Sequence, residues 1–228
     1  MKNIIIFIFF GVISFNSWAF PIPKEGKAKF DIIRKNKIIG SHEITFLKID
    51  NKLTLETKID IEVKVLFIPA YKFHHTSIET WIDGSFEEID AYTDFEDERE
   101  YFIKGIKNEN FFIASGMDGE LELDKKILPS NFWNINILSQ KEVFDTQKGI
   151  VRKITVKKLD NEEIEISDKK IKCKKFILNA SSNPKDLGPF PEYTLWYDEN
   201  NNELMKFKFQ NWKDKKIVTI IRKNQEES

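Results

Sequence analysis

The stretch that decides the fold is residues 53–67, which read LTLETKIDIEVKVLF. Apolar side chains occupy every odd position there except Thr57, and polar or charged side chains occupy every even position except Leu66. Only an extended strand sorts residues with a period of two. At about 3.3 Å per residue this strand would span roughly 50 Å, well beyond the usual strand of about 20 Å. Its length predicts a large curved sheet with one apolar and one polar face.

The same alternation recurs, less regularly, along the rest of the chain. Turn signals such as Asp83-Gly84, Asp160-Asn161 and Gly116-Met117-Asp118-Gly119 separate the segments and favour sequential antiparallel pairing. No alternation of strands with long helices is present. The further predicted strands are 27–33, 38–49, 71–82, 86–95, 100–106, 110–114, 150–157, 163–166, 171–178, 193–197, 204–209 and 216–222.

One segment breaks the pattern. Pro129-Ser130 precedes residues 131–140, in which apolar side chains do not alternate, and Ser130 can cap the start of a helix. The sequence therefore predicts an all-β fold, a single antiparallel and strongly curved sheet (half-barrel or β-clam), with one short helix packed near residues 130–140. No repeat or linker divides residues 20–228, so we expect one domain.

The N-terminus has the pattern of a secretory signal peptide. Lys2 precedes the apolar run 4–15, and Ser17-Trp18-Ala19 offers small residues to a signal peptidase. The run is shorter than the roughly 20 residues that a spanning helix needs. We predict a cleaved signal peptide over residues 1–19 and a soluble periplasmic product, with no lipid anchor because no cysteine follows the cleavage site and no transmembrane segment in the mature chain.

Cysteine count and charge exclude two classes of protein. Cys173 is the single cysteine and cannot form an internal disulfide, so stability must come from core burial, and a buried small side chain is the expectation for it. Removal of residues 1–19 takes away only Lys2, which leaves 35 basic and 37 acidic side chains. This balance argues against nucleic acid as a partner.

No catalytic or metal-binding motif is present. The sequence contains no Gly-x-Ser-x-Gly elbow, His-Glu-x-x-His helix, phosphate loop or dinucleotide fingerprint, so no cofactor is predicted. The acidic segments 94–98 and 198–203 lack the spacing of a calcium loop. His42 and His75 fall in phase with apolar residues and should face the apolar side, whereas His74 must point to the other face.

Aromatic side chains are large and numerous for a plain sandwich core, at 13% of the chain. They are compatible with ordinary packing or with a half-open barrel whose concave side receives a hydrophobic ligand. For the second interpretation, the candidate ligand-binding residues are Tyr71, Phe73, Trp81, Trp133 and Trp196, with His42 or His75 at a polar head group.

Four stretches carry a family resemblance: 30–34 with 39–42, 67–73 with 81–84, 129–134, and 195–198 with Phe207. In order and spacing they resemble an uncharacterised family of proteobacterial secreted proteins, a domain of unknown function without an established activity. The last hairpin, 195–198 with 203–206, is also distantly similar to the closing hairpin of the LolA and LolB lipoprotein carriers. That resemblance implies a β-clam fold, and no lid mechanism is transferred with it.

Three hypotheses follow. The first is a non-enzymatic periplasmic protein that binds or carries an acyl chain or lipid-like amphiphile. The second is a cell-envelope interaction module with a filled core, whose exposed strand edge binds another protein. The third is a hydrolase with an unrecognised site. An apolar cavity of several hundred Å³ would favour the first, a filled core the second, and converging carboxylates or a His-linked nucleophile the third.

We predict that the mature chain begins at Phe20, because Ser17-Trp18-Ala19 is the small-x-small junction that follows the apolar run. N-terminal sequencing of protein exported by a bacterial host tests this. A chain that still begins at Met1 after export would contradict the prediction, and a start a few residues away would move only the cleavage point.

Overall fold

The computed structural model describes residues 20–65, 68–95, 99–186 and 189–223. The predicted signal peptide, residues 1–19, lies outside them. The strands are β1 (Lys27–Arg34), β2 (Lys37–Ile49), β3 (Lys52–Val65), β4 (Ile68–Ile82), β5 (Ser85–Phe95), β6 (Arg99–Lys107), β7 (Phe111–Gly116), β8 (Gly119–Asp124), β9 (Glu142–Asp145), β10 (Ile150–Lys158), β11 (Glu162–Ile166), β12 (Lys169–Ala180), β13 (Tyr193–Asp198), β14 (Leu204–Gln210) and β15 (Ile217–Arg222).

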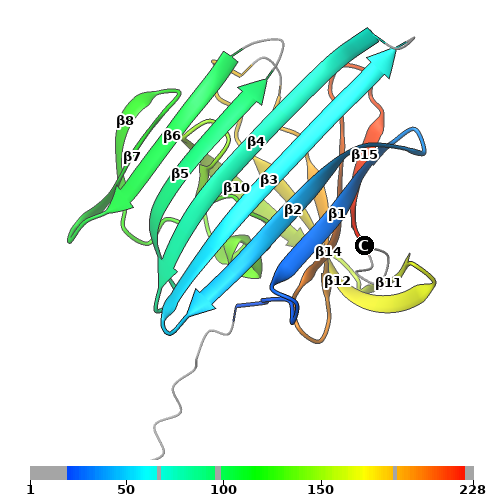
Figure 1. Ribbon diagram of the computed structural model, residues 1–228, viewed down its shortest axis with the longest axis horizontal. Coiled ribbons are helices and arrows are strands. Elements are labelled where there is room, and N and C mark those ends of the chain that lie inside the picture. The colour runs from blue at the N-terminus through cyan, green and yellow to red at the C-terminus, as the bar shows by residue number, and fades with distance from the viewer. Residues whose placement is uncertain (1–19, 66–67, 96–98, 187–188, 224–228) are drawn as a thin grey trace, which may run out of the picture.

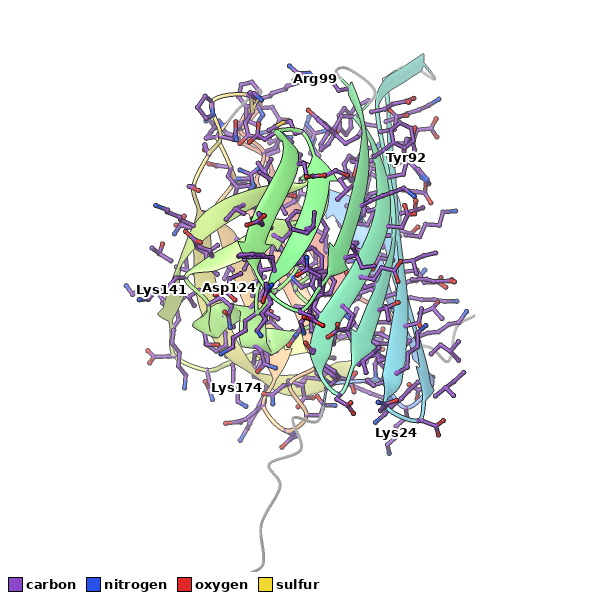
Figure 2. The ribbon with its side chains drawn as sticks, turned by 90° about the vertical axis from the view of Figure 1, so that its left-hand side faces the viewer. Lys24, Tyr92, Arg99, Asp124, Lys141 and Lys174 are labelled. Carbon is purple, nitrogen blue, oxygen red and sulfur yellow. The ribbon has the colours of Figure 1, made fainter. Side chains whose placement is uncertain are left out.

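All these strands belong to one antiparallel sheet of order β8-β7-β6-β5-β4-β3-β2-β1-β15-β14-β13-β12-β10-β9, with β11 paired to β12. The sheet folds over itself: β2 to β6 form one layer, and β10, β12 and β14 lie behind it (Figure 1). Seen from the side, the two layers enclose an interior between them (Figure 2). Because β8 and β9 do not pair, the sheet is an open half-barrel, and the predicted fold class is confirmed.

The long strand predicted over residues 53–67 is β3, and its neighbour β4 is longer still, at 15 residues. The inner face of β3 is fully packed at Leu53 and Leu55, which are 3% and 0% exposed, but Ile59 and Ile61 are only half-buried. One end of the interior is therefore filled and the other is not.

The predicted helix is present as a single turn, the 3-10 helix η1 (Ile135–Ser139). Its cap is Asn134, whose side chain accepts a hydrogen bond from the backbone N–H of Asn136 at 3.1 Å. Ser130 does not cap the helix; its backbone N–H donates to the carbonyl oxygen of Phe144 in β9. Pro129 and Ser130 thus lie beside β9 as extended chain, with Pro129 bridged to Phe144, and the helix begins after them.

Two strands were not predicted. β8 is an edge strand without a buried residue. Its sequence therefore does not need apolar residues on one face, and the alternation that predicts a strand is weak. β9 has four residues, Glu142–Asp145, of which the last three are buried together, so it shows no period of two.

A close backbone contact spans the open side of the half-barrel. The N–H of Met117, after β7, donates to the carbonyl oxygen of Lys148, before β10, at 2.7 Å. The adjacent Gly116 and Gly149 are packed so closely that a Cβ on Gly149 would lie 2.6 Å from the Cα of Gly116. Only glycine fits this contact, and Gly149 also has a φ of +67°.

We expect Gly149→Ala to destabilise the fold more than Gly84→Ala. Both glycines have positive φ, so both substitutions carry a backbone cost of about 1–2 kcal/mol. Gly84 has open space around it, whereas the new methyl group at residue 149 overlaps the backbone of Gly116, which adds about 1–3 kcal/mol. Urea unfolding of both variants measures the difference, and equal losses would show that the contact does not hold the open side.

Candidate functional site

A cavity of about 660 Å³ lies between the two layers. It is lined mainly by apolar side chains from the inner faces of β1 to β5 and of β13 to β15. Those from the first group are Ile32, Ile39, Ile59, Ile61, Val63, Tyr71, Phe73 and Phe95, and those from the second are Tyr193, Phe207, Phe209, Val218 and Ile220. Such a volume is in the range of small-molecule sites, about 300–1,000 Å³.

An aromatic cluster fills the interior beyond the cavity. The Trp81 and Trp133 rings meet edge to face with centroids 5.5 Å apart, and Phe20 contacts both at 5.3 Å. Phe46 and Phe86 complete the cluster. Along the inner face of β4, Tyr71, Phe73 and His75 line the cavity, whereas Trp81 lies in this packed end. The cavity therefore has a closed end.

His42 is a polar group on the inner face of β2. Its ring stacks on Phe30, with centroids 5.3 Å apart, and it is 9% exposed. Burial, together with the neighbouring His75, lowers the pKa of His42 to about 3, so the ring is neutral at physiological pH. Its Nδ1 atom is buried and has no hydrogen-bond partner among the described residues. A buried polar atom in this state is suited to bind a water.

His75 lies two strands away, since both histidines pair with Ile59 of β3. Its Nδ1 is 2.8 Å from the hydroxyl oxygen of Thr93. Burial lowers the pKa of His75 to about 4, although the nearby Asp145 acts in the opposite direction. The two histidines thus present neutral, polar surfaces to the cavity.

Four charged side chains form a compact group at the side of the cavity near β9 and β10. Nε of Arg152 donates to Asp145 at 2.6 Å, and Nη1 donates to Asp186 and to the carbonyl oxygen of Ser181, both at 2.9 Å. Lys148 donates to Asp186 at 2.6 Å. Burial alone would raise the pKa of Asp186, but the hydrogen bonds from Arg152 and Lys148 lower it to about 2. The group, called here the charged quartet, is fully paired and carries no net charge.

A second set of charged groups lies at two turns. Arg34, at the end of β1, forms an ion pair with Asp214 of the turn between β14 and β15. Lys35, Trp212 and Lys213 of the same turns also line the cavity. We call this set the mouth of the cavity.

The candidate residues from the sequence divide into three groups. Tyr71, Phe73, His42 and His75 line the cavity together. Trp81 and Trp133 lie in the closed end. Trp196 faces the outer side of β13, in a separate cluster with Ile164, Ile166 and Cys173. Burial raises the pKa of the Cys173 thiol to about 12, so this cysteine is an inert core residue, as expected.

Sequence reasoning missed the charged quartet and Arg34. One signal was available for Arg152, which falls in phase with the apolar residues Ile150 and Ile154 and so points inward on β10. Its partner Asp186 comes from the irregular segment after β12, and no local pattern links two segments so far apart. Within the described ranges, no group of three or more His, Cys, Asp or Glu side chains could hold a metal ion.

The fold and cavity define the class: an open antiparallel half-barrel, closed at one end by aromatic side chains, that encloses an apolar site with a few polar groups. In the part of the chain that the structure describes, no helix has the length and apolarity to cross a membrane. The chain belongs to the family "Domain of unknown function (DUF6134)", whose model matches residues 30–222. The predicted membership of a family without known function is thereby confirmed.

Structural comparison supports the same fold. The chain is similar to a β-barrel-like protein of domain of unknown function DUF1849 from Brucella abortus, with a TM-score of 0.59 and 10% identity over 87% of this chain and 98% of that one. A DUF1329 family protein from Desulfovibrio piger aligns at a TM-score of 0.23 and 8% identity, over 87% and 82% of the two chains. No curated protein matches the sequence. The similarity to the LolA and LolB carriers stays a prediction.

The environment of Glu79 leads to a prediction about how the stability of the fold depends on pH. It is 0% exposed on the inner face of β4, and it accepts hydrogen bonds from Nε1 of Trp81 at 3.1 Å and from Asn131. Burial raises the pKa of Glu79 from 4.5 to about 7, against the effect of the Trp81 bond. The folded state therefore holds a proton that the unfolded state releases above pH 4.5, so this group makes stability fall as the pH rises toward 7.

We expect Glu79→Gln to remove that slope. Relative to wild type, the free energy of unfolding of the variant should increase by up to about 3 kcal/mol between pH 4.5 and pH 7, on top of a constant offset from altered hydrogen bonding. Chemical unfolding across this range measures the difference, with the exposed Glu120→Gln as control. If the Glu79→Gln curve runs parallel to wild type, Glu79 does not bind the proton.

Proposed function

We propose that this protein is a non-enzymatic binding or carrier protein that holds a hydrophobic or amphiphilic ligand, such as an acyl chain, between the two layers of its sheet. The observation that carries the proposal is the cavity of about 660 Å³ with apolar walls and a closed end. Apolar walls around a preformed space favour an apolar guest, because its transfer from water is worth roughly 25 cal/mol per Å² of buried surface.

The partial burial of several wall residues supports a cavity that binds a ligand over a cavity that is filled by the protein's own side chains. Ile59, Ile61 and Tyr71 are half-buried although they face the interior of the half-barrel, whereas Leu55, on the same face of β3, is fully buried. A filled core, which the envelope interaction module requires, would bury all of them alike. We therefore favour ligand binding over the interaction module.

We also propose that the protein acts in the periplasm after cleavage of residues 1–19. The location of Phe20 supports this proposal, because its ring packs against Trp81 and Trp133 at the closed end. The residue that cleavage would expose as the new N-terminus thus belongs to the folded domain.

Ligand binding in the cavity can be tested with a substitution that fills part of the cavity with a larger side chain. Ile61→Trp places a larger side chain in the wall of the cavity, and we expect it to reduce the affinity for an environment-sensitive acyl probe by about tenfold or more, since the probe and the indole would compete for the same space. Titration of the purified mature chain, followed by probe fluorescence, measures this. Competition with octanoate, dodecanoate and hexadecanoate then reports the chain length that fits.

The matched control is Ile78→Trp, because Ile78 is 50% exposed on the outer face of β4. It should bind the probe as wild type does. Thermal unfolding of both variants shows that they fold. Absence of a saturable response in wild type, or equal binding by wild type and a folded Ile61→Trp variant, would refute ligand binding in this cavity.

A further inference from the structure

The charge that lines the cavity is unevenly distributed. Five basic and three acidic side chains contribute to the lining, although the mature chain as a whole has a slight excess of acid. Two of the bases and two of the acids form the charged quartet and cancel one another. The remaining charged residues, Arg34, Lys35, Lys213 and Asp214, lie at the mouth and carry a net positive charge.

The charged groups of the quartet already have hydrogen-bond partners within the protein. All three guanidinium nitrogens of Arg152 donate to protein acceptors, and Asp186 accepts from both Arg152 and Lys148. The Arg152 guanidinium also lies on the Phe190 ring, 4.4 Å from its centroid. An anionic group placed here would have to break existing charged bonds.

Arg34 differs in this respect. Its Nη2 donates to Asp214, but its Nε is buried and has no hydrogen-bond partner among the described residues. Arg34 is one of the residues that line the cavity. A guanidinium N–H that lacks an acceptor is suited to bind an anionic oxygen, because hydrogen bonds between two charged groups are the strong ones. Lys35 and Lys213 on the neighbouring turns add attraction for the same charge.

The distance from the mouth to the closed end limits the length of a guest. Phe30 pairs with His42 across β1 and β2, and Arg34 lies four residues further along β1. Four strand residues span about 13 Å. Over that span the lining of β1 to β4 is apolar, from Ile32 and Ile39 to Ile59 and Ile61, and it ends at the neutral His42 and His75. This surface fits one alkyl chain that enters from the mouth and ends near the histidines.

We infer that the ligand is a single-chain amphiphile with an anionic head group, carboxylate or phosphate, which accepts a hydrogen bond from Nε of Arg34 while its alkyl chain lies along β1 to β4. This inference rests on the proposed function and adds to it the charge and orientation of the guest. The head group remains at the mouth beside Lys35, and the chain points toward the closed end.

The test compares head groups on one chain. Dodecanoate, dodecyl phosphate, dodecanol and dodecyltrimethylammonium, each below its micelle concentration, compete for the acyl probe on the purified mature chain. We expect at least one anion to bind about tenfold or more tightly than the alcohol and the cation, and the advantage to shrink as salt increases. The tighter of the two anions distinguishes a fatty-acid source from a phospholipid source.

Arg34→Gln should abolish the advantage of the anions and leave dodecanol binding unchanged. The control is Lys29→Gln, which removes an equal charge from the opposite face of β1 and should have no effect. Asp214→Asn separates a binding role from a structural one: it keeps Arg34 and removes a competing carboxylate, so anion affinity should stay the same or increase, whereas a purely structural ion pair predicts a decrease.

Two results would overturn the inference while the proposed function stands: wild type that binds dodecanol as tightly as both anions, or Arg34→Gln that weakens all four compounds equally. If none of the four compounds displaces the probe and the probe itself does not bind, the proposed function fails instead. The two failures are therefore distinguishable in the same experiment.

Discussion

The structure depends on the need to cover one apolar face of two very long strands. β3 and β4, with 14 and 15 residues, offer a continuous apolar surface on one side, and η1 is too short to cover it. The cover must come from the sheet itself, which folds over at β1 and β15 so that β13 and β14 face β3 and β4. A twisted sheet of this many strands curls readily. The close contact of Gly116 and Gly149 then limits how far the two layers can separate.

Incomplete coverage follows from the same constraint. At one end Phe20, Phe46, Trp81 and Trp133 supply enough volume to fill the space between the layers. At the other end the inner side chains of β3 and β4 are Ile59, Ile61, Tyr71 and Phe73, and the facing layer does not reach all of them. The interior is therefore divided into a core and a cavity along the length of the same strands.

The sequence predicted the fold well because period-two alternation is a local signal that a strand keeps wherever it lies in a sheet. The alternation in residues 53–67 was enough to predict a long strand with one apolar face, and His42 and His75 were placed on the inner face by phase alone. The side of the sheet that becomes concave is not a local property. Trp196 alternates as Trp81 does, yet it faces outward because the sheet curves away from it and β11 covers it.

The site was harder to predict because its polar groups come from distant segments. Arg34 and Asp214 are 180 residues apart, and Arg152 and Asp186 are 34 apart, with Asp186 in the irregular segment after β12. Ion pairs of this kind depend on how strands stack, which alternation does not encode. Large aromatic side chains were expected to line a cavity, but tryptophan is as effective at filling space as at binding a ligand, and the two at the closed end fill it.

The polar groups in the cavity are arranged so that an apolar guest meets no uncompensated charge. His42 and His75 are neutral because burial lowers the pKa of both, and the quartet pairs each charge with an opposite one. An unpaired buried charge beside an alkyl chain would be costly, since the low local dielectric gives it no compensation. Among the residues that line the cavity, a net positive charge remains at the mouth, where water reaches it. The interior is therefore electrostatically compatible with an alkyl chain, and the mouth is compatible with a charged head group.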